Sequence, residues 1–586
     1  MRLDVSAFFH FVEVAQVRTR ALLLAAVLMI LGAPLAGAAT SANAQSPLGM
    51  NLNAMGYFSP EQPFLNIFKT TAITASNNTW TSWSMRTIGG MSQQNVKPTM
   101  DANGYPTSLP SGIQACTLVL GGLSASNAGT GPYYRSGQYV VLYDGAGTTW
   151  YSNDASIVSQ SPGRDVINVA NPSAGGIWVC IQQTDPQHTG NNVRNIRMVK
   201  AEEESLLTSG GVFEPNFLSL MSRFKVLRAM QWLNIDDSPT PPGNWANRSQ
   251  VTDAGWGGPN GVPYEVIIQL CNATGADCWL NVPHTADNNF ITQLATLAHN
   301  SINPTQKVYI EFSNEVWNTN YPQNQYATQQ GQALWPGSDS GDANRSWYGM
   351  RTAQTCDIWK SVWGSDASRV VCVLGAQGAN PWTATTSLNC SLWTGSGNAP
   401  CAKHGISAVA IAPYIGWGVY QSSMEPGSEG LSALFSAMTS SVTSVSAQEA
   451  AYKTALAPYN LPFIAYEGGQ TLVGFPGAQN GSSEVNLFIQ ANRDSRMGSA
   501  YTQALNDWKS NGGEVYVIYD DIYTPSMYGE WGALESFMDT VSPLSSAPPK
   551  WQAIQNFISA NPCWWSGCGG NTAAVPSAPT NLHVTN

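Results

Sequence analysis

The chain contains eight short apolar runs, and segments of helical periodicity lie between most of them. The apolar runs cover residues 48–54, 225–232, 278–282, 308–312, 370–374, 408–414, 463–467 and 515–519. Helical spacing covers 213–223, 264–273, 289–299, 344–363, 431–456, 484–509 and 551–560. Such alternation implies a parallel sheet, and eight units imply that the sheet closes on itself. The sequence therefore predicts an α/β chain built on a (β/α)8 TIM barrel.

A second type of segment interrupts this alternation after the first barrel strand. From about 114 to 199, short alternating runs such as 137–143 and 176–182 are separated by Gly, Asn, Ser and Pro turns. Strands of this length at regular spacing are typical of an antiparallel β-sandwich. We therefore predict a barrel formed by 45–112 and 200–562, with a β-sandwich inserted at 113–199.

The two ends of the chain carry different signals. Arg18 and Arg20 precede the apolar run 21–31, and Ala42-Asn43-Ala44 fits a small-residue cleavage site, so 1–44 is predicted to be a signal peptide. We expect a secreted protein, extracellular or periplasmic, without a membrane partner after cleavage; an uncleaved anchor is the alternative. At the other end, 563–575 is expected to be a linker with a disulfide, and 576–586 resembles the truncated opening of a fibronectin type III module.

Ten cysteines fit an oxidising compartment. Their spacing suggests bridges, although connectivity stays open from sequence alone: Cys271 with Cys278, Cys356 with Cys372, Cys390 with Cys401, Cys563 with Cys568, and Cys116 with Cys180. The chain has no Cys-x-x-Cys pair and its six histidines are scattered. We therefore expect no metal site and no cofactor.

Charge and aromatic content narrow the class of partner. Charged residues make up 11% of the chain, the formal net charge is −11, and there is no basic block to track phosphates, so nucleic acid is not expected as a partner. The chain has 21 Trp and 22 Tyr, whose flat rings suit stacking on sugars, although most must serve the core. We expect a monomer that binds a polysaccharide or an oligosaccharide.

Two predicted strands run directly into a glutamate. Residues 307–318, K-V-Y-I-E-F-S-N-E-V-W-N, place Glu315 just past a strand, and residues 461–467, L-P-F-I-A-Y-E, end in Glu467. Groups at the carboxyl ends of barrel strands meet at one mouth of the barrel. Glycoside cleavage needs one carboxyl held neutral and a second held ionised, and this pair could supply both.

Asn314-Glu315 after an apolar strand, Glu467 at a strand end three units later, and Tyr414 at the end of the intervening strand together resemble clan A of the retaining glycoside hydrolases. The resemblance implies that Glu315 is the acid/base, Glu467 the nucleophile, Asn314 a ligand of the sugar 2-hydroxyl, and Tyr414 a hydrogen-bond donor to the nucleophile. The opening L-G-M-N-L-N-A-M-G-Y-F-S with P-F-L-N-I-F-K also resembles bacterial secreted proteins sometimes labelled cellulose-binding. The resemblance implies hydrolysis of a polysaccharide by double displacement. A β-glucan such as cellulose is the first candidate substrate.

Further residues near strand ends are weaker candidates for the substrate site. Arg228 could orient the nucleophile or form a buried ion pair, and His284 could line the cleft or be structural. The polar candidates are Asn53 and Gln377, and Asn51 and Asp520 are weaker ones. The candidate platforms for sugar stacking are Trp317 and Trp531, and Trp232 and Trp382 are weaker ones. Glu311 lies inside the strand pattern, where we expect a core or salt-bridge partner instead of a catalytic role.

Two other functions compete with hydrolysis of glycosides. A non-catalytic carbohydrate-binding or adhesion protein on a glycosidase-like barrel would keep the aromatic cleft but would need neither Glu315 nor Glu467. A serine esterase would need a Gly-x-Ser-x-Gly turn, which the sequence lacks. The paired glutamates therefore favour the hydrolase.

Overall fold

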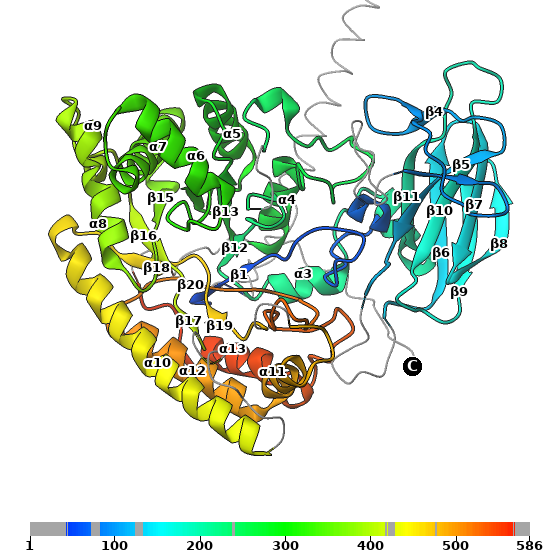
Figure 1. The fold of residues 1–586 in the computed structure, drawn as a ribbon. Coiled ribbons are helices and arrows are strands. Elements are labelled where there is room, and N and C mark those ends of the chain that lie inside the picture. The colour runs from blue at the N-terminus through cyan, green and yellow to red at the C-terminus, as the bar shows by residue number, and fades with distance from the viewer. Residues whose placement is uncertain are drawn as a thin grey trace, which may run out of the picture.

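The fold is described from a computed structural model, which describes residues 43, 45–71, 83–123, 133–236, 241–416, 419, 428–474, 478–565 and 568. The predicted signal peptide, apart from Asn43, and the fibronectin-like segment 576–586 lie outside these residues. A barrel of strands surrounded by helices lies beside an antiparallel β unit, which is drawn in cyan on the right of Figure 1. Within the described residues, no helix combines the length and apolar character needed to cross a membrane.

Eight parallel strands close into a barrel in chain order. They are β1 Leu48–Asn51, β12 Val226–Arg228, β13 Asp277–Val282, β14 Val308–Phe312, β15 Val370–Gly375, β16 Ala408–Ile411, β18 Phe463–Ala465 and β20 Tyr516–Ile518. Each lies within or across one of the eight predicted runs, which confirms the TIM-barrel prediction. A short parallel pair, β17 Tyr414–Ile415 and β19 Gly469–Gln470, continues from two of them.

The barrel interior changes from apolar to polar along the strands. Buried aliphatic and aromatic side chains fill its lower part, among them Val226, Trp279, Ile464 and Val517. Toward the carboxyl ends, paired positions are polar: Asn51 lies opposite Arg228 on the neighbouring strand, and Asn281 lies opposite Glu311. A buried charge needs a partner, so this polar layer already suggests an ion-pair network beneath the barrel mouth.

Helices surround the barrel, and the very long α10 runs along its lower left edge in Figure 1. The α-helices are α2 Glu204–Thr208, α3 Pro215–Met221, α4 Tyr264–Thr274, α5 Asn288–Ser301, α6 Pro322–Leu334, α7 Ser340–Trp363, α8 Pro381–Asn389, α9 Ser391–Gly395, α10 Ser428–Leu456, α11 Ser483–Arg493, α12 Ser495–Asn511 and α13 Pro549–Ala560. The 3-10 helices are η1 Ile67–Thr70, η2 Ala201–Glu203, η3 Trp245–Asn247, η4 Gly364–Arg369, η5 Cys401–Lys403, η7 Ala457–Tyr459 and η8 Leu544–Ser546. The segment predicted as one helix at 484–509 is two, because Asp494 ends α11 and caps α12.

The inserted β unit consists of two four-stranded antiparallel sheets, ordered β2-β5-β10-β7 and β11-β6-β9-β8, with a separate hairpin β3-β4. Its strands are β2 Ser84–Thr87, β3 Thr99–Met100, β4 Pro106–Ser108, β5 Ile113–Val119, β6 Gly137–Asp144, β7 Gly147–Asn153, β8 Ala155–Ser161, β9 Arg164–Val169, β10 Ile177–Thr184 and β11 Arg194–Lys200. The first strand, β2, lies before residue 113, so the sheets begin earlier than the predicted boundary. A four-residue strand carries too little periodicity to be recognised alone.

Four of the five predicted disulfides are formed: Cys116–Cys180, Cys271–Cys278, Cys390–Cys401 and Cys563–Cys568. The fifth prediction is wrong, because Cys356 on α7 and Cys372 on β15 are free thiols. Both are fully buried in the apolar interface between helix and sheet. A buried thiol packs as a small apolar side chain, so this pair fills the core without a bond.

Candidate active site

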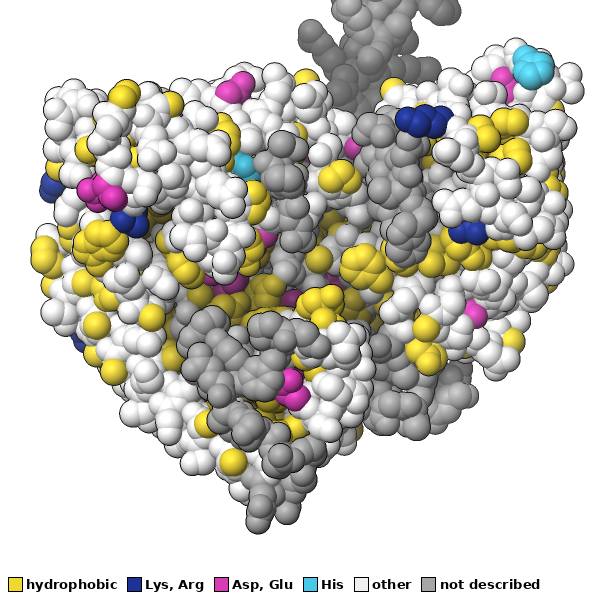
Figure 2. All heavy atoms as spheres, viewed as in Figure 1, with side chains coloured by type: hydrophobic (Ala, Val, Ile, Leu, Met, Phe, Trp, Pro, Cys, Tyr) yellow, Lys and Arg dark blue, Asp and Glu magenta, His cyan; other side chains and the backbone are white. Residues whose placement is uncertain are grey.

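A cavity of about 540 Å³ lies at the carboxyl ends of the barrel strands. In the space-filling view, the middle of this face is hollowed, and acidic side chains are visible against hydrophobic ones at its base (Figure 2). The lining residues come from loops after β12, β14, β15, β16, β18 and β20 and from α10: Met230, Asp236, Glu315, Trp317, Asn318, Asn320, Tyr321, Gln377, Gly378, Ala379, Ala412, Tyr414, Ser441, Ser444, Val445, Gln448, Glu467, Thr471, Tyr519 and Trp531. Both predicted catalytic glutamates therefore face one cavity.

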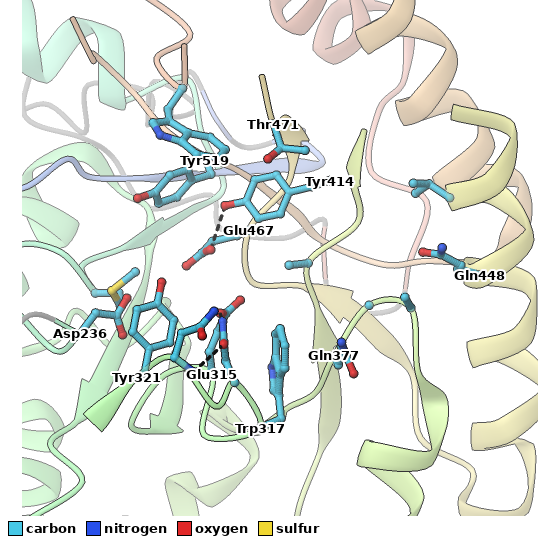
Figure 3. A pocket seen from close by; sticks show the side chains of 18 of the residues that line it. Asp236, Glu315, Trp317, Tyr321, Gln377, Tyr414, Gln448, Glu467, Thr471 and Tyr519 are labelled. Carbon is cyan, nitrogen blue, oxygen red and sulfur yellow. Dashed lines mark hydrogen bonds between the residues drawn. The ribbon is translucent and has the colours of Figure 1, made fainter. Parts of the chain in front are cut away.

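Glu467 follows β18, the seventh barrel strand, and each of its carboxylate oxygens receives a hydrogen bond. Arg228 donates from Nη1 to Oε1 at 2.7 Å, and the Tyr414 hydroxyl donates to Oε2 at 2.9 Å (Figure 3). Burial, and then the charge of Glu467, raise the pKa of Tyr414, so its hydroxyl remains a donor. A buried cation and a phenol hydroxyl thus hold the two oxygens of the Glu467 carboxylate in place.

Arg228 is the hub of the polar layer and is fully buried. Besides Glu467, it donates to Asn51 Oδ1 at 3.1 Å, to Asn314 Oδ1 at 2.6 Å, and to Glu311 Oε2 from Nε and Nη2 at 3.1 and 2.9 Å. Burial alone lowers the pKa of Arg228, but Glu311 and Glu467 more than offset this and raise it. Arg228 is therefore a permanent cation held between two carboxyl groups, and the salt-bridge alternative for Glu311 is confirmed.

Glu315 follows β14, the fourth barrel strand, and within the described part of the chain no Lys or Arg forms an ion pair with it. Tyr466 donates its hydroxyl to Oε1 at 2.8 Å, and the Asn318 amide donates to Oε2 at 2.9 Å. Burial, followed by the nearby charge of Glu467, raises the pKa of Glu315 to about 8. An ordinary glutamate titrates near pH 4.3, so this carboxyl holds a proton at neutral pH.

The backbone around Asn314 turns sharply. Ser313 and Glu315 have φ of 64° and 41°, in the left-handed region that side chains other than glycine rarely adopt. Such conformations persist where surrounding contacts enforce them, and they cluster at functional sites. Here the turn brings the Asn314 amide against Arg228 and the Glu315 carboxyl into the cavity.

Asn314 links the hub to an acid that the sequence did not single out. Its amide donates from Nδ2 to both oxygens of Asp236 at 3.0 Å. Gln323 of α6 donates to Asp236 Oδ1 at 2.9 Å and to the Asn314 carbonyl at 2.9 Å. Hydrogen bonds therefore run without interruption from Asp236 through Asn314 and Arg228 to Glu467.

Aromatic side chains border the glutamates. The Trp531 ring lies 5.5 Å from the ring of Tyr414 and 5.4 Å from that of Tyr519, both edge to face. Trp317 lies on the opposite side of the pocket beside Glu315, next to Gln377 (Figure 3). Trp317, Gln377 and Trp531, all candidates from the sequence, thus line the cavity.

Four of the sequence-predicted site residues are not among those that line the cavity: Arg228 and Asn314, which lie in the polar layer described above, and His284 and Asn53. His284 is buried and packs edge to face on Tyr326 at 5.1 Å, outside the cavity lining. Asn53 donates from Nδ2 to the Ile522 carbonyl at 2.7 Å and so holds the segment after β20. Proximity to a strand end fixes the level of a side chain but not its direction. None of the four weaker candidates is among the residues that line the cavity. Asn51 accepts a hydrogen bond from Arg228, Asp520 and Trp232 are fully buried, and Trp382 is half exposed beside Arg345.

Several residues of the site escaped the sequence reasoning: Asp236, Asn318, Tyr321, Tyr466, Tyr519, and Ser441, Ser444 and Gln448 of α10. Tyr466 and Tyr519 had a readable signal, since each lies at the end of a predicted barrel strand. Asp236 and Tyr321 lie in irregular loops, and the α10 residues lie within a helix, where no strand end marks them.

No known family model and no curated protein matches this chain. Solved structures that resemble it include a broad-specificity endoglucanase of glycoside hydrolase family 5 from Clostridium acetobutylicum, at 11% identity and TM-score 0.32 over 58% of this chain and 88% of that one. A family 26 endo-β-1,4-mannanase from Cellulomonas fimi is 11% identical, with TM-score 0.32 over 60% and 68% of the two chains. A psychrophilic family 10 endo-β-1,4-xylanase is 12% identical, with TM-score 0.28 over 59% and 92%. Because these scores are low, the assignment of the barrel fold rests on the strand pairing of this chain, and the proposed function rests on the chemistry of its cavity.

Proposed function

We propose that this chain is a secreted, retaining β-glycoside hydrolase that cleaves a polysaccharide by double displacement. One observation carries the proposal: two glutamates face the same cavity in opposite electrostatic settings. Glu467 is paired with Arg228, whereas burial raises the pKa of Glu315 to about 8. Glycoside cleavage requires this combination of one ionised and one protonated carboxyl group.

In the first step, Glu315 gives its proton to the leaving glycosidic oxygen while a Glu467 oxygen attacks the anomeric carbon. The glycosidic C–O bond breaks, an ester bond to Glu467 forms, and Glu315 is left ionised. Arg228 and the Tyr414 hydroxyl hold the Glu467 carboxylate in place. Positioning of this kind lowers the entropic part of the barrier before the chemistry begins.

In the second step, water attacks the anomeric carbon and the ester bond breaks. Glu315, now ionised, takes a proton from that water, so both carboxyl groups return to their starting states. Tyr466 and Asn318 donate to the two Glu315 oxygens and support the ionised form between the steps. Asn314 lies buried between Arg228 and Asp236, and it is our candidate for the contact to the sugar 2-hydroxyl.

Trp317, Trp531 and Tyr414 provide aromatic surface for sugar rings. A β-glucan such as cellulose is the first substrate candidate, with xylan, mannan or an exopolysaccharide next. The predicted signal peptide and the four disulfides support secretion. We expect the enzyme to act as a monomer.

The rival function is non-catalytic carbohydrate binding on the same barrel. A binding protein gains nothing from a carboxyl group that is buried and kept protonated beside an ionised one, because desolvating that group costs stability. The different settings of Glu315 and Glu467 therefore favour the enzyme.

The test is release of reducing ends from a panel of polysaccharides and aryl β-glycosides. Glu467→Ala is expected to abolish turnover. Glu315→Ala is expected to lose polysaccharide activity but to retain part of its rate on aryl glycosides, whose leaving groups need no proton. Glu202→Ala, at an exposed glutamate of η2 outside the cavity lining, is the matched control and is expected to keep wild-type activity.

Proton NMR of the first-formed anomer decides the stereochemistry. Retention supports the double displacement, whereas inversion replaces it with a single displacement by water. If the wild-type protein cleaves none of the substrates, or if Glu467→Ala retains its full rate, the catalytic assignment is refuted.

A further inference from the structure

Helix α10 contributes side chains to the wall of the cavity, although the helices of a barrel usually pack only against the outside of the strands. Ser441, Ser444, Val445 and Gln448 of α10 line the cavity. Ser444 and Val445 lie three and four residues after Ser441, and Gln448 lies four and three residues after them, so all four positions lie on one face of the helix. One wall of the proposed substrate cleft is thus a helix face.

Two contacts clamp this face against the barrel loops. At one end, the Gly416 N–H donates to Ser441 Oγ at 2.7 Å. At the other end, the Tyr452 hydroxyl donates to the carbonyls of Gln377 and Asn380 at 2.5 and 3.2 Å. Gln448 lies between the two clamps and one turn before Tyr452, so the helix holds it beside the Gln377 loop.

Gln377 is fixed through its backbone and presents its side chain to the cavity. Its N–H donates to Thr383 Oγ1 at 3.1 Å, and its carbonyl accepts from Tyr452. In the part of the chain that the structure describes, the side-chain amides of Gln377 and Gln448 have no hydrogen-bond partner, and both are partly exposed. A primary amide carries two donor hydrogens and an accepting oxygen, which matches the hydroxyl groups of a sugar.

The charge of the cavity restricts which sugar fits. Among the described lining residues, the charged side chains are Asp236, Glu315 and Glu467, and none is Lys or Arg. Arg228, the nearest cation, is fully buried and already bound to Glu311 and Glu467. A uronate or sulfate group would meet acids without a counter-charge, and like-charge contacts of this kind oppose binding.

We propose that Gln377 and Gln448 form an outer subsite that binds a neutral sugar unit of the substrate, with α10 as its wall. The proposal rests on the proposed function for the identity of the ligand as a glycan. In Figure 3, Trp317 lies between Glu315 and Gln377, with Gln448 beyond them, while Asp236 and Tyr321 lie on the other side of the glutamates. The subsite therefore extends the cleft in one direction from the glutamate pair.

The test measures binding without turnover. Glu315→Gln, which is isosteric with the protonated carboxyl, is titrated calorimetrically with the neutral tetrasaccharides of cellulose, mannan and xylan and with anionic tetragalacturonate. We expect at least one neutral tetrasaccharide to bind and the anionic one to bind at least tenfold more weakly. Adding Gln448→Ala or Gln377→Ala is expected to weaken the neutral ligand about tenfold, because each truncation removes one or two hydrogen bonds.

Gln332→Ala is the matched control, since Gln332 is exposed on α6 outside the cavity. It is expected to leave the dissociation constant unchanged, and melting temperatures verify that all variants fold. Dissociation constants within twofold for both cavity variants, absence of binding by every neutral tetrasaccharide, or tighter binding of the anionic one would each overturn the subsite. Tight neutral binding that Gln448→Ala weakens, together with a wild-type protein that cleaves nothing, would retain the subsite and refute the hydrolase.

Discussion

Replacing Tyr466 by Phe should move the upper pH limit of activity to higher pH. The Tyr466 hydroxyl donates to Glu315 Oε1 at 2.8 Å, and this hydrogen bond lowers the pKa of Glu315 by stabilising its ionised form. Burial and the charge of Glu467 outweigh it and raise the pKa to about 8. Without the hydroxyl, the opposing contribution is lost and the pKa of Glu315 rises further.

The size of the shift follows from the hydrogen bond removed. A bond of this type contributes about 0.5–1.5 kcal/mol, and one pKa unit corresponds to about 1.36 kcal/mol, so the pKa should rise by about 0.4–1.1 units. Because Glu315 must be protonated to act as the acid, kcat/KM falls as pH rises through its pKa. At pH 9, the fraction of the plateau kcat/KM should rise from about 0.1 in the wild type to about 0.2–0.55 in Tyr466→Phe.

The assay is a pH profile of kcat/KM on a substrate whose leaving group requires protonation. Asn318→Ala removes the donor to the second Glu315 oxygen and should shift the limb in the same direction. Tyr459→Phe, which removes a hydroxyl bonded to Asn389 instead of to the site, is the control and should leave the limb in place. A limb that stays unchanged or moves downward in Tyr466→Phe would show that Glu315 is not the titrating acid.

Two further predictions concern stability. Arg228→Met should lower the free energy of unfolding, measured by chemical denaturation, by about 3–5 kcal/mol, because it leaves Glu311 and Glu467 buried without their cation. Adding Glu311→Met should recover part of this loss. A double variant no more stable than the single one would contradict this account. Removing the Cys116–Cys180 bridge by a double Ala substitution should cost about 4 kcal/mol, because the bridge closes a loop across 64 residues of the inserted unit. The melting temperature of the inserted unit should fall measurably in this variant, and an unchanged melting temperature would contradict the estimate.

The barrel could be predicted because its strands are short apolar runs that end abruptly in turns. The parts that escaped have weaker patterns. Helix α6, Pro322–Leu334, is rich in Gln and buries only Gln323, Ala327 and Gly331, so no apolar stripe marks it. Cys356 and Cys372 were paired by spacing, whereas their buried positions in an apolar interface suit free thiols as well as a bridge.

The site could be predicted where a polar residue ends a barrel strand or follows its end closely. Arg228 ends β12, whereas Glu315, Tyr414 and Glu467 follow shortly after β14, β16 and β18, and the structure brings these residues together. The rule identifies the level in the barrel but not the facing direction, which is why His284 and Asn53 were included. Residues that reach the cavity from loops and from α10 depend on tertiary packing that no local pattern encodes.

The different settings of the two glutamates follow from the position of one arginine. Arg228 ends β12, and its guanidinium reaches Glu311 on β14 and Glu467 after β18, so these two carboxyl groups share one cation. Among the residues that the structure describes, the side-chain donors to Glu315 are the neutral groups of Tyr466 and Asn318. The charge of Glu467 then helps to keep Glu315 protonated. A single buried cation placed off centre thus gives two identical side chains the different electrostatic settings that the proposed roles of nucleophile and acid require.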